Sequence, residues 1–227
     1  MKVQIISVIF LDLILKPYEL PTLRGYFSKQ FPEHTELHNH LPDGKFSYKF
    51  PKIQYRIISG HPALIGFNKG MEILKSIFLN LDEIIINNRK YMIHEKEIFV
   101  YEHDFGATDK FINYKFISPW MALKEENYEK YKTLDKIEQQ RFLKHILREN
   151  LKTLSKGFNY TIPDIEEIKV EGFFKPKLVN FKNIRMLCFK GEFMVNFHIP
   201  DLLGLGKQSA RGFGVISSPS LRDGLKK

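Results

Sequence analysis

The chain contains a single cysteine, Cys188, among its 227 residues. A lone thiol cannot form an internal disulfide, and a zinc site made of several cysteines is also excluded. Cysteine usage of this kind is typical of proteins from reducing compartments. We therefore predict a cytoplasmic location.

No apolar run of the sequence is long enough to cross a bilayer. The most apolar stretch, residues 3–15, is interrupted by Gln4, Ser7 and Asp12, and no small-residue cleavage site follows it. We interpret this stretch as a buried strand rather than as a signal peptide or a membrane span. No association with a membrane is expected.

Acidic residues are fewer than basic ones, with 26 Asp and Glu against 35 Lys and Arg, which gives a net charge of +9. Two stretches, residues 44–71 and 174–190, each hold five basic residues and no acid. Such charge makes polyanions natural partners. From these stretches we select four candidate RNA-binding residues: Lys52, Arg56, Lys182 and Arg185.

Aromatic side chains interleave with the lysines of the second acid-free stretch, at Phe174, Phe181 and Phe189. RNA phosphates attract the charges, and unstacked bases attract the rings. A core strand with lysines on its solvent face gives the same pattern, so this observation leaves both interpretations open.

The hydrophobic pattern predicts two successive β-α-β-β units separated by the polar segment 103–110. The fold class that fits is α+β, with two tandem ferredoxin-like (RRM-like) domains and antiparallel sheets. We predict an N-terminal domain at residues 1–106 and a C-terminal domain at residues 107–227. The expected strands are 2–14, 46–50, 53–57, 83–86, 90–101, 111–117, 166–174, 177–189 and 192–199, and the expected helices are 22–31, 68–80 and 125–156.

A glycine-rich segment lies near the C-terminus, where residues 204–214 hold four glycines together with Lys207 and Arg211. It is not a phosphate-binding P-loop, because Asp201 and Gln208 stand where that motif needs a glycine and a hydroxyl residue. It is not a dinucleotide-binding fingerprint either, because Ser209 replaces the third glycine. The segment therefore needs another explanation.

Three of the eight histidines, His34, His38 and His40, fall within seven positions. One interpretation is a metal site, for which the nearby acids Glu33, Glu36 and Asp43 would supply further ligands, although no established metal-binding spacing is present. A second interpretation is an ordinary surface loop. A third is acid-base catalysis without a metal, because histidine exchanges protons near neutral pH.

The third interpretation suits cleavage of RNA by its own 2′-hydroxyl, which needs a base, an acid and a cation for the phosphate. His40 or His38 can transfer protons, and Tyr48 can orient or donate through its hydroxyl. Lys45 or Lys29 can supply the positive charge. The residues alone do not decide which of the two histidines faces the phosphate.

Three segments resemble CRISPR-associated endoribonucleases that cut precursor repeat RNA, members of the repeat-associated mysterious protein superfamily. Residues 196–216 (NFHIPDLLGLGKQSARGFGVI) are similar to the C-terminal glycine-rich loop of that family. Residues 23–27 (LRGYF) resemble its first helix, and residues 113–131 resemble the start of its second domain in one branch. The histidines also fall where such enzymes commonly keep a catalytic histidine.

The resemblance implies two ferredoxin-like domains and metal-independent cleavage that needs no cofactor and leaves a 2′,3′-cyclic phosphate and a 5′-hydroxyl. By position, His40 would be the acid-base residue and His38 its partner. The glycine loop would pack against the first helix and contact RNA. The implied RNA-binding residues of this loop are Gly204, Gly206, Lys207, Gln208, Ser209, Arg211, Gly212 and Gly214.

The implied partner is CRISPR repeat RNA, with subunits of a CRISPR effector complex as further candidates and a monomer or homodimer as the expected state. Two alternatives stay open from the sequence. One is a non-catalytic RNA-binding subunit of the same superfamily, and the other is a metal-dependent nuclease.

Overall fold

The computed structural model describes residues 1–37 and 50–224, with side chains to residue 221. It divides into two compact units, each built around a sheet of four strands. The N-terminal unit comprises Lys2–His103 together with Ala210–Gly212, and the C-terminal unit comprises Met1, Asp104–Ser209 and the chain from Phe213 onward. Within the described residues, no helix has the length and apolar character needed to span a membrane.

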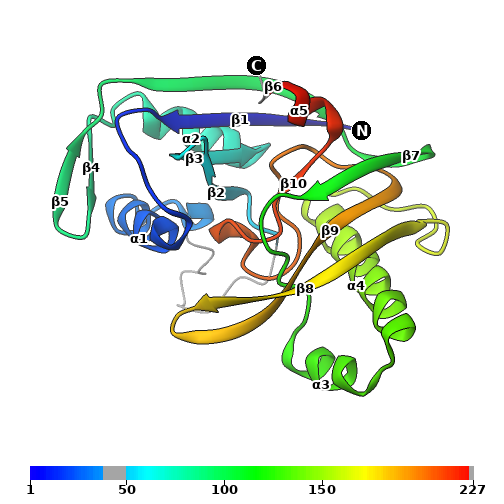
Figure 1. Cartoon of the computed structure of the whole chain (residues 1–227). Coiled ribbons are helices and arrows are strands. Elements are labelled where there is room, and N and C mark those ends of the chain that lie inside the picture. The colour runs from blue at the N-terminus through cyan, green and yellow to red at the C-terminus, as the bar shows by residue number, and fades with distance from the viewer. Residues whose placement is uncertain (38–49, 225–227) are drawn as a thin grey trace. The chain divides into compact units, whose positions relative to one another are not determined.

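The N-terminal unit contains a sheet with the strand order β2-β3-β1-β6 (Figure 1). Strand β3 is antiparallel to both β1 and β2. With α1 after β1 and α2 after β3, this is the ferredoxin-like arrangement. The elements are β1 (Lys2–Phe10), α1 (Leu20–Gln30), β2 (Ile53–Ile58), β3 (His61–Phe67), α2 (Lys69–Phe78), β4 (Glu83–Ile86), β5 (Arg89–Met92) and β6 (Lys96–Asp104), with 3-10 turns at Pro17–Glu19 and Thr35–Leu37.

Both helices of this unit pack on the same face of the sheet. Leu23 and Phe27 of α1 join Leu74 of α2 in one buried cluster with Ile6 and Val8 of β1. Burial of these side chains removes a large apolar area from water and holds α1 firmly on the sheet. The residues that follow α1 in the chain therefore start from a rigid support.

The C-terminal unit has the sheet order β10-β7-β9-β8, and all of its strand pairs are antiparallel. This order matches that of the first sheet, with β7, β8, β9 and β10 as the four successive strands. Its elements are β7 (Gly106–Phe116), α3 (Glu125–Thr133), α4 (Lys136–Gly157), β8 (Val170–Phe181), β9 (Ile184–His198), β10 (Ile216–Ser217) and α5 (Pro219–Gly224). A 3-10 turn (Ser209–Arg211) lies between β9 and β10 in the chain, and its last two residues belong by their contacts to the N-terminal unit. The predicted α+β fold class with two ferredoxin-like units is thus confirmed.

An aromatic cluster forms the core of this second unit. Trp120 stacks on Phe116 with ring centroids 5.0 Å apart, and Phe174 and Phe193 pack around them. In the chain, the glycine-rich segment occupies the stretch between β9 and β10, where a ferredoxin-like unit has its second helix. A loop with a short 3-10 turn replaces that helix.

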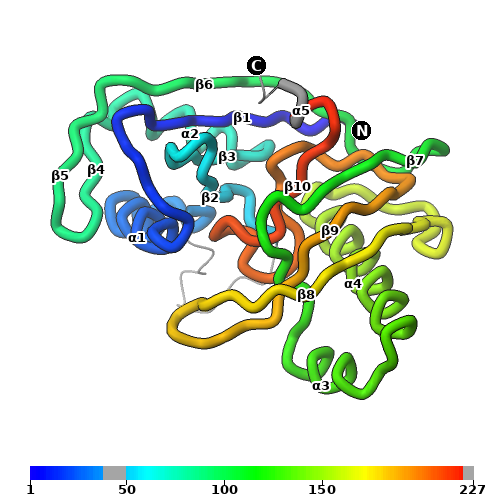
Figure 2. The backbone as a smooth tube through the Cα atoms, in the orientation of Figure 1, coloured from blue at the N-terminus to red at the C-terminus, as the bar shows by residue number. Residues whose placement is uncertain are grey.

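Several predicted boundaries differ from the observed ones. The single helix predicted at 125–156 is two helices, because Asp135 caps α4 by accepting from the backbone N–H groups of Ile137 and Glu138. The three strands predicted between 166 and 199 are two long ones, β8 and β9, which run side by side to a tight turn (Figure 2). The polar segment 103–110 belongs mostly to β6 and β7. The strand predicted at 46–50 lies almost entirely outside the described residues.

Candidate functional site

Four of the five predicted catalytic residues, His38, His40, Lys45 and Tyr48, lie in residues 38–49, outside the described part of the chain. The fifth, Lys29, lies in the last turn of α1 and is exposed. The catalytic assignment therefore stays a prediction. The surroundings of this segment can be described from the residues that flank it.

Leu37 is the last described residue before the histidines, and it is held in place from two sides. Its side chain is buried. Its carbonyl oxygen accepts a hydrogen bond from Nε of Arg24 and another from the hydroxyl of Tyr55, each at 3.3 Å. Leu37 is therefore fixed beside α1 and β2.

The charged groups around this point belong to the N-terminal unit. Burial lowers the pKa of Arg24, and the nearby positive charge of Arg211 lowers it further. Burial also lowers the pKa of Arg211. Burial raises the pKa of Tyr55 well above the usual value for a tyrosine, while the charge of Arg24 acts in the opposite direction. Two guanidinium groups thus lie close enough to repel each other, in surroundings that an anion would stabilise.

Part of the glycine-rich segment lies in the same unit as Leu37. Arg211 and Gly212 belong by their contacts to the unit formed by residues 2–103. Gly212 has a φ of +85°, and a Cβ atom on it would come within 2.8 Å of Leu20, the first residue of α1. This close approach explains the glycine at position 212 and agrees with the expected packing against the first helix.

The rest of the glycine-rich segment is fixed by backbone hydrogen bonds within the C-terminal unit. Leu205 N–H donates to the carbonyl of Gly214, and Gly214 N–H donates to that of Pro119, both at 2.9 Å. A Cβ on Gly214 would lie only 2.0 Å from the Leu205 carbonyl oxygen, so no larger residue fits this ladder. The loop is therefore a preorganised element.

The predicted RNA-binding residues differ in their exposure. Lys207, Lys182 and Arg185 are exposed, while Gln208 and Lys52 are half-buried, and burial lowers the pKa of Lys52. Ser209 is buried, as are Gly204 and Gly214, whereas Gly206 is half-buried. None of these predicted contacts with RNA is tested by the structure of the chain alone.

Arg56 occupies a different environment from the one predicted. It is only 2% exposed, and its guanidinium donates to the carbonyl of Tyr55 and to the side chain of Gln54. Burial lowers its pKa to about 9. In this arrangement Arg56 is an internal residue that satisfies neighbouring polar groups, and it has no surface to offer to a phosphate.

Of the two interpretations of the basic, aromatic stretch, the structure favours a core strand with lysines on its solvent face. Phe174 and Phe189 are completely buried, so their rings are not available for stacking on bases. Phe181 is half-buried and contacts Phe213 edge-on, with ring centroids 5.4 Å apart. The ring that β8 does expose is Phe173, at 60%. Alternation along the strand placed the aromatics on the core face and left the lysines outside.

Arg24 is a candidate functional residue that the sequence prediction missed. It lies within the motif that resembled the family's first helix, but its role depends on contacts with Leu37 and Arg211 that only the fold creates. Among residues 1–37 and 50–224, no group of three or more His, Cys, Asp or Glu side chains is arranged to hold a metal ion.

Comparisons with known proteins bear on both units. Residues 1–104 match the model of the Cas6b N-terminal domain, and residues 106–219 match that of the Cas6b C-terminal domain. The chain belongs to the Cas6b family. The resemblance to CRISPR-associated proteins that process repeat RNA is thereby confirmed.

Solved Cas6b structures are similar to the whole chain. One crystal structure of Cas6b is 37% identical, with a TM-score of 0.89, and the match covers 96% of this chain and 100% of that one. A second, named CRISPR RNA processing endoribonuclease Cas6b, is 33% identical with a TM-score of 0.77 over the same shares. An uncharacterized protein of Methanocaldococcus jannaschii is 37% identical over 141 residues, which cover 62% of this chain and 95% of that protein.

Proposed function

We propose that this chain is an endoribonuclease that cleaves CRISPR precursor repeat RNA without a metal ion. Membership of the Cas6b family supports the substrate class, because one solved relative is named a CRISPR RNA processing endoribonuclease. The net charge of +9 supports a polyanionic substrate. The observation that carries the proposal is the position of Leu37, whose carbonyl is held by Arg24 beside Arg211 of the glycine-rich segment.

The proposed reaction is an attack of the RNA on itself. The 2′-hydroxyl before the scissile linkage gives up its proton, and its oxygen bonds to the adjacent phosphorus. The bond between phosphorus and the 5′-oxygen breaks, and that oxygen takes up a proton. The products are a 2′,3′-cyclic phosphate and a 5′-hydroxyl, and no water is consumed.

We assign the proton transfers to the histidine segment, with His40 as the principal acid-base residue and His38 as its partner. Tyr48 orients or donates through its hydroxyl, and Lys45 or Lys29 supplies positive charge. Arg24 and Arg211 have a place in this scheme as cations near the start of that segment. Positive charge aimed at a phosphate stabilises the additional charge that develops during the attack.

The test uses a synthetic RNA that carries the repeat of the CRISPR array in the source genome. With excess EDTA present, the wild-type chain is expected to cut this RNA at one position, and analysis of the ends should find a cyclic phosphate. His40→Ala should slow single-turnover cleavage by about 10²–10⁴-fold, the usual contribution of a proton-transfer group, with RNA affinity little changed. His94→Ala, at an exposed histidine of the same unit, is the matched control.

Three outcomes would contradict the proposal. Binding without any cleavage by the wild-type chain would indicate a non-catalytic RNA-binding subunit. Loss of cleavage in EDTA would indicate a metal-dependent nuclease. Equal cleavage rates for His40→Ala and His94→Ala would remove His40 from the chemistry, and the same measurement on His38→Ala would then identify the residue that replaces it.

Further parts of the proposal concern organisation. We propose domains at residues 1–106 and 107–227, a cytoplasmic location, and a monomer or homodimer that delivers its product to subunits of a CRISPR effector complex. The proposed RNA contacts are the backbone of the glycine-rich segment with Lys207 and Arg211, and the basic residues Lys52, Lys182 and Arg185.

A further inference from the structure

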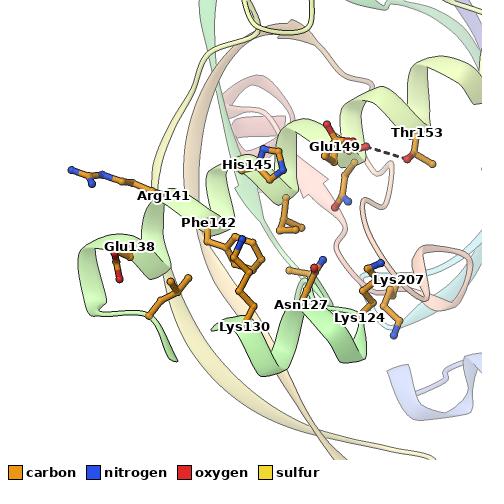
Figure 3. A pocket seen from close by; sticks show the side chains of 14 residues that line it. Lys124, Asn127, Lys130, Glu138, Arg141, Phe142, His145, Glu149, Thr153 and Lys207 are labelled. Atoms are coloured by element: carbon orange, nitrogen blue, oxygen red, sulfur yellow. Dashed lines mark hydrogen bonds between the residues drawn. The ribbon is translucent and has the colours of Figure 1, made fainter. Parts of the chain in front are cut away.

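A cleft of about 920 Å³ lies in the C-terminal unit between α3 and α4 (Figure 3). Its size falls within the range of small-molecule and nucleotide sites. Residues of both helices line it, and Lys207 of the glycine-rich segment lies at one end, beside Lys124. Neither the sequence pattern nor the family resemblance pointed to this cleft.

Positive charge prevails along the lining. It includes four cations, Lys124, Lys130, Arg141 and Lys207, against two acids. Both acids are already engaged by the protein, because Glu138 completes the cap of α4 by accepting from Asp135 N–H, and Glu149 lies 3.8 Å from Lys152. Within residues 1–37 and 50–224, neither Arg141 nor Lys207 forms an ion pair. Lys124 pairs with Glu126, which does not line the cleft. The charge that remains on Lys130, Arg141 and Lys207 favours an anion.

The walls of the cleft also offer groups that suit a nucleobase. Phe142 is half-buried, and the ammonium group of Lys130 lies over its ring at 5.1 Å. Asn127 presents an amide, and Asn150 is oriented by the hydrogen bond that its Oδ1 accepts from Trp120 Nε1 at 3.0 Å. That bond leaves the Asn150 amide N–H groups as donors toward a base edge. An aromatic ring, amides and lysines together are typical of sites for unpaired RNA.

The cleft is joined rigidly to the glycine-rich segment. The backbone N–H of Lys207 donates to the carbonyl of Met121 at 3.0 Å, and the two residues form a β-bridge. A Cβ on Gly206 would lie 2.7 Å from Trp120 Nε1. This part of the glycine-rich segment therefore packs directly on Trp120, which precedes α3 in the chain. An RNA strand that contacts Lys207 therefore also lies close to Lys124 and to the cleft.

We propose that the α3–α4 cleft binds an unpaired segment of the same RNA, one or two nucleotides long, beyond the glycine-rich segment. Its phosphates contact Lys124 and Lys207, and one base enters beside Phe142, whereupon Lys130 moves from the ring to the backbone. This inference rests on the proposed function for the identity of the ligand. The excess of cations over available carboxylates favours RNA over a protein partner.

The test compares two cleft variants with a charge-matched control from the same helices. Lys124→Ala combined with Lys130→Ala should weaken binding of the repeat RNA roughly tenfold and lower the log–log salt slope by about 1.4, the effect of losing two contacts with single-stranded phosphates. Phe142→Leu should weaken binding about fivefold or more with no change in salt slope, because a stacking ring is lost. The control combines Lys132→Ala with Lys136→Ala, at exposed lysines that do not line the cleft. It should change the RNA affinity and the salt slope less than the combined Lys124→Ala and Lys130→Ala variant does.

A second measurement locates the contact. The same RNA, with a photoreactive 4-thiouridine placed at each position in turn, should crosslink to peptides from residues 125–153 at one short stretch of positions, and the Phe142→Leu variant should lose this crosslink. Circular dichroism melting of each variant shows whether the fold is retained.

The outcomes separate this inference from the proposed function. If the wild-type chain cleaves the RNA but both cleft variants bind like the control and no crosslink forms, the inference is wrong and the proposed function stands. If the wild-type chain binds without cleaving and the variants bind less tightly, the cleft site stands and the enzyme assignment falls. If the wild-type chain does not bind the RNA, both are wrong.

Discussion

At the scale of a single residue, Gly212 is the position where the glycine-rich segment packs closely against Leu20 of α1. Its φ of +85° and the 2.8 Å approach of Leu20 leave no room for a side chain without adjustment. We predict that Gly212→Ala destabilises the chain by about 1–2 kcal/mol, because a non-glycine residue is strained in this region and Leu20 must shift. Urea unfolding would measure the change.

Gly25 provides the matched control for that substitution. It lies in α1, and a Cβ on it would meet no atom within 4 Å. Gly25→Ala should therefore stabilise the helix, by up to about 1 kcal/mol, because alanine has the higher helix propensity. Similar unfolding midpoints for the two variants would show that the segment does not depend on the fit at position 212.

A substitution of Arg211 tests whether Arg24 and Arg211 contribute to RNA binding. Its charge lowers the pKa of Arg24, so the two groups repel each other in the free protein. We predict that Arg211→Ala weakens RNA binding and lowers the log–log salt slope by about 0.7, the contribution of one contact with a single-stranded phosphate. A filter-binding series in increasing salt measures both quantities.

Lys75→Ala is a suitable control for Arg211→Ala, because Lys75 is a surface cation on α2 that pairs with Glu72. An identical salt slope for the two variants would mean that Arg211 does not contact phosphate. Arg211→Lys should recover the slope but only part of the affinity, since an ammonium group lacks the bidentate geometry of a guanidinium.

Arg56 and Arg24 show how far the site could be predicted from the sequence. Arg56 has a sequence context like that of a surface cation, within an acid-free stretch, but β2 is buried along most of its length. Arg24 sits on an ordinary amphipathic helix, and its importance comes from Leu37 and Arg211, which are distant in the chain. Composition identified the charge, whereas only the fold determines which charges reach the surface.

The β8–β9 hairpin carries a feature that its own stability does not explain. Lys175 and Lys190 are directly opposite each other in the register, and both are exposed. Like charges in a cross-strand pair are destabilising, whereas a polyanion lying on the hairpin would offset the repulsion. The arrangement is expected for a hairpin that contacts RNA.

Lys190→Glu separates the two effects. The substitution places opposite charges across the strands, and we predict a gain in stability of about 0.2–1 kcal/mol. RNA affinity should fall, because the site loses one positive charge and gains a negative one. Thermal melting and RNA titration measure the two quantities. A more stable variant with unchanged RNA affinity would exclude the hairpin from the interface.

Most elements were predictable from local patterns, and the exceptions have physical causes. β3 was missed because Pro62 and Gly66 lie within a short, continuously apolar run, although the sheet tolerates both. The break between α3 and α4 could have been found from Asp135 and Glu138, which form a capping box. The β8–β9 turn uses Lys182 and Asn183, both with positive φ, and lacks the glycine that usually marks such turns.

At the scale of the whole molecule, the two sheets share one strand order although no sequence repeat is visible. The alternation of strands and helices was enough to predict this architecture. The replacement of the last helix by the glycine-rich segment was not predictable from periodicity, because its conformation depends on contacts such as those of Gly214 with Leu205 and Pro119. Resemblance to a family supplied what local patterns could not.

The single cysteine makes the stability of the folded chain measurable. Cys188 is completely buried in β9, and burial raises the pKa of its thiol to about 11. A buried, protonated thiol reacts only when the structure around it opens. We predict that Cys188 resists a thiol reagent such as DTNB in the native protein at neutral pH and reacts rapidly in denaturant.

Repeat RNA should slow this reaction if it binds only the folded chain. At a free RNA concentration of about 100 times Kd, the opened population falls about 100-fold, and labelling in the regime of rapid reclosing slows by the same factor. The slowing should become smaller with Arg211→Ala at the same RNA concentration, in proportion to the loss of RNA affinity of that variant. Immediate labelling of the native protein would show that the β8–β9 hairpin opens locally, and a rate insensitive to RNA would show that the opening which exposes Cys188 does not disturb RNA binding.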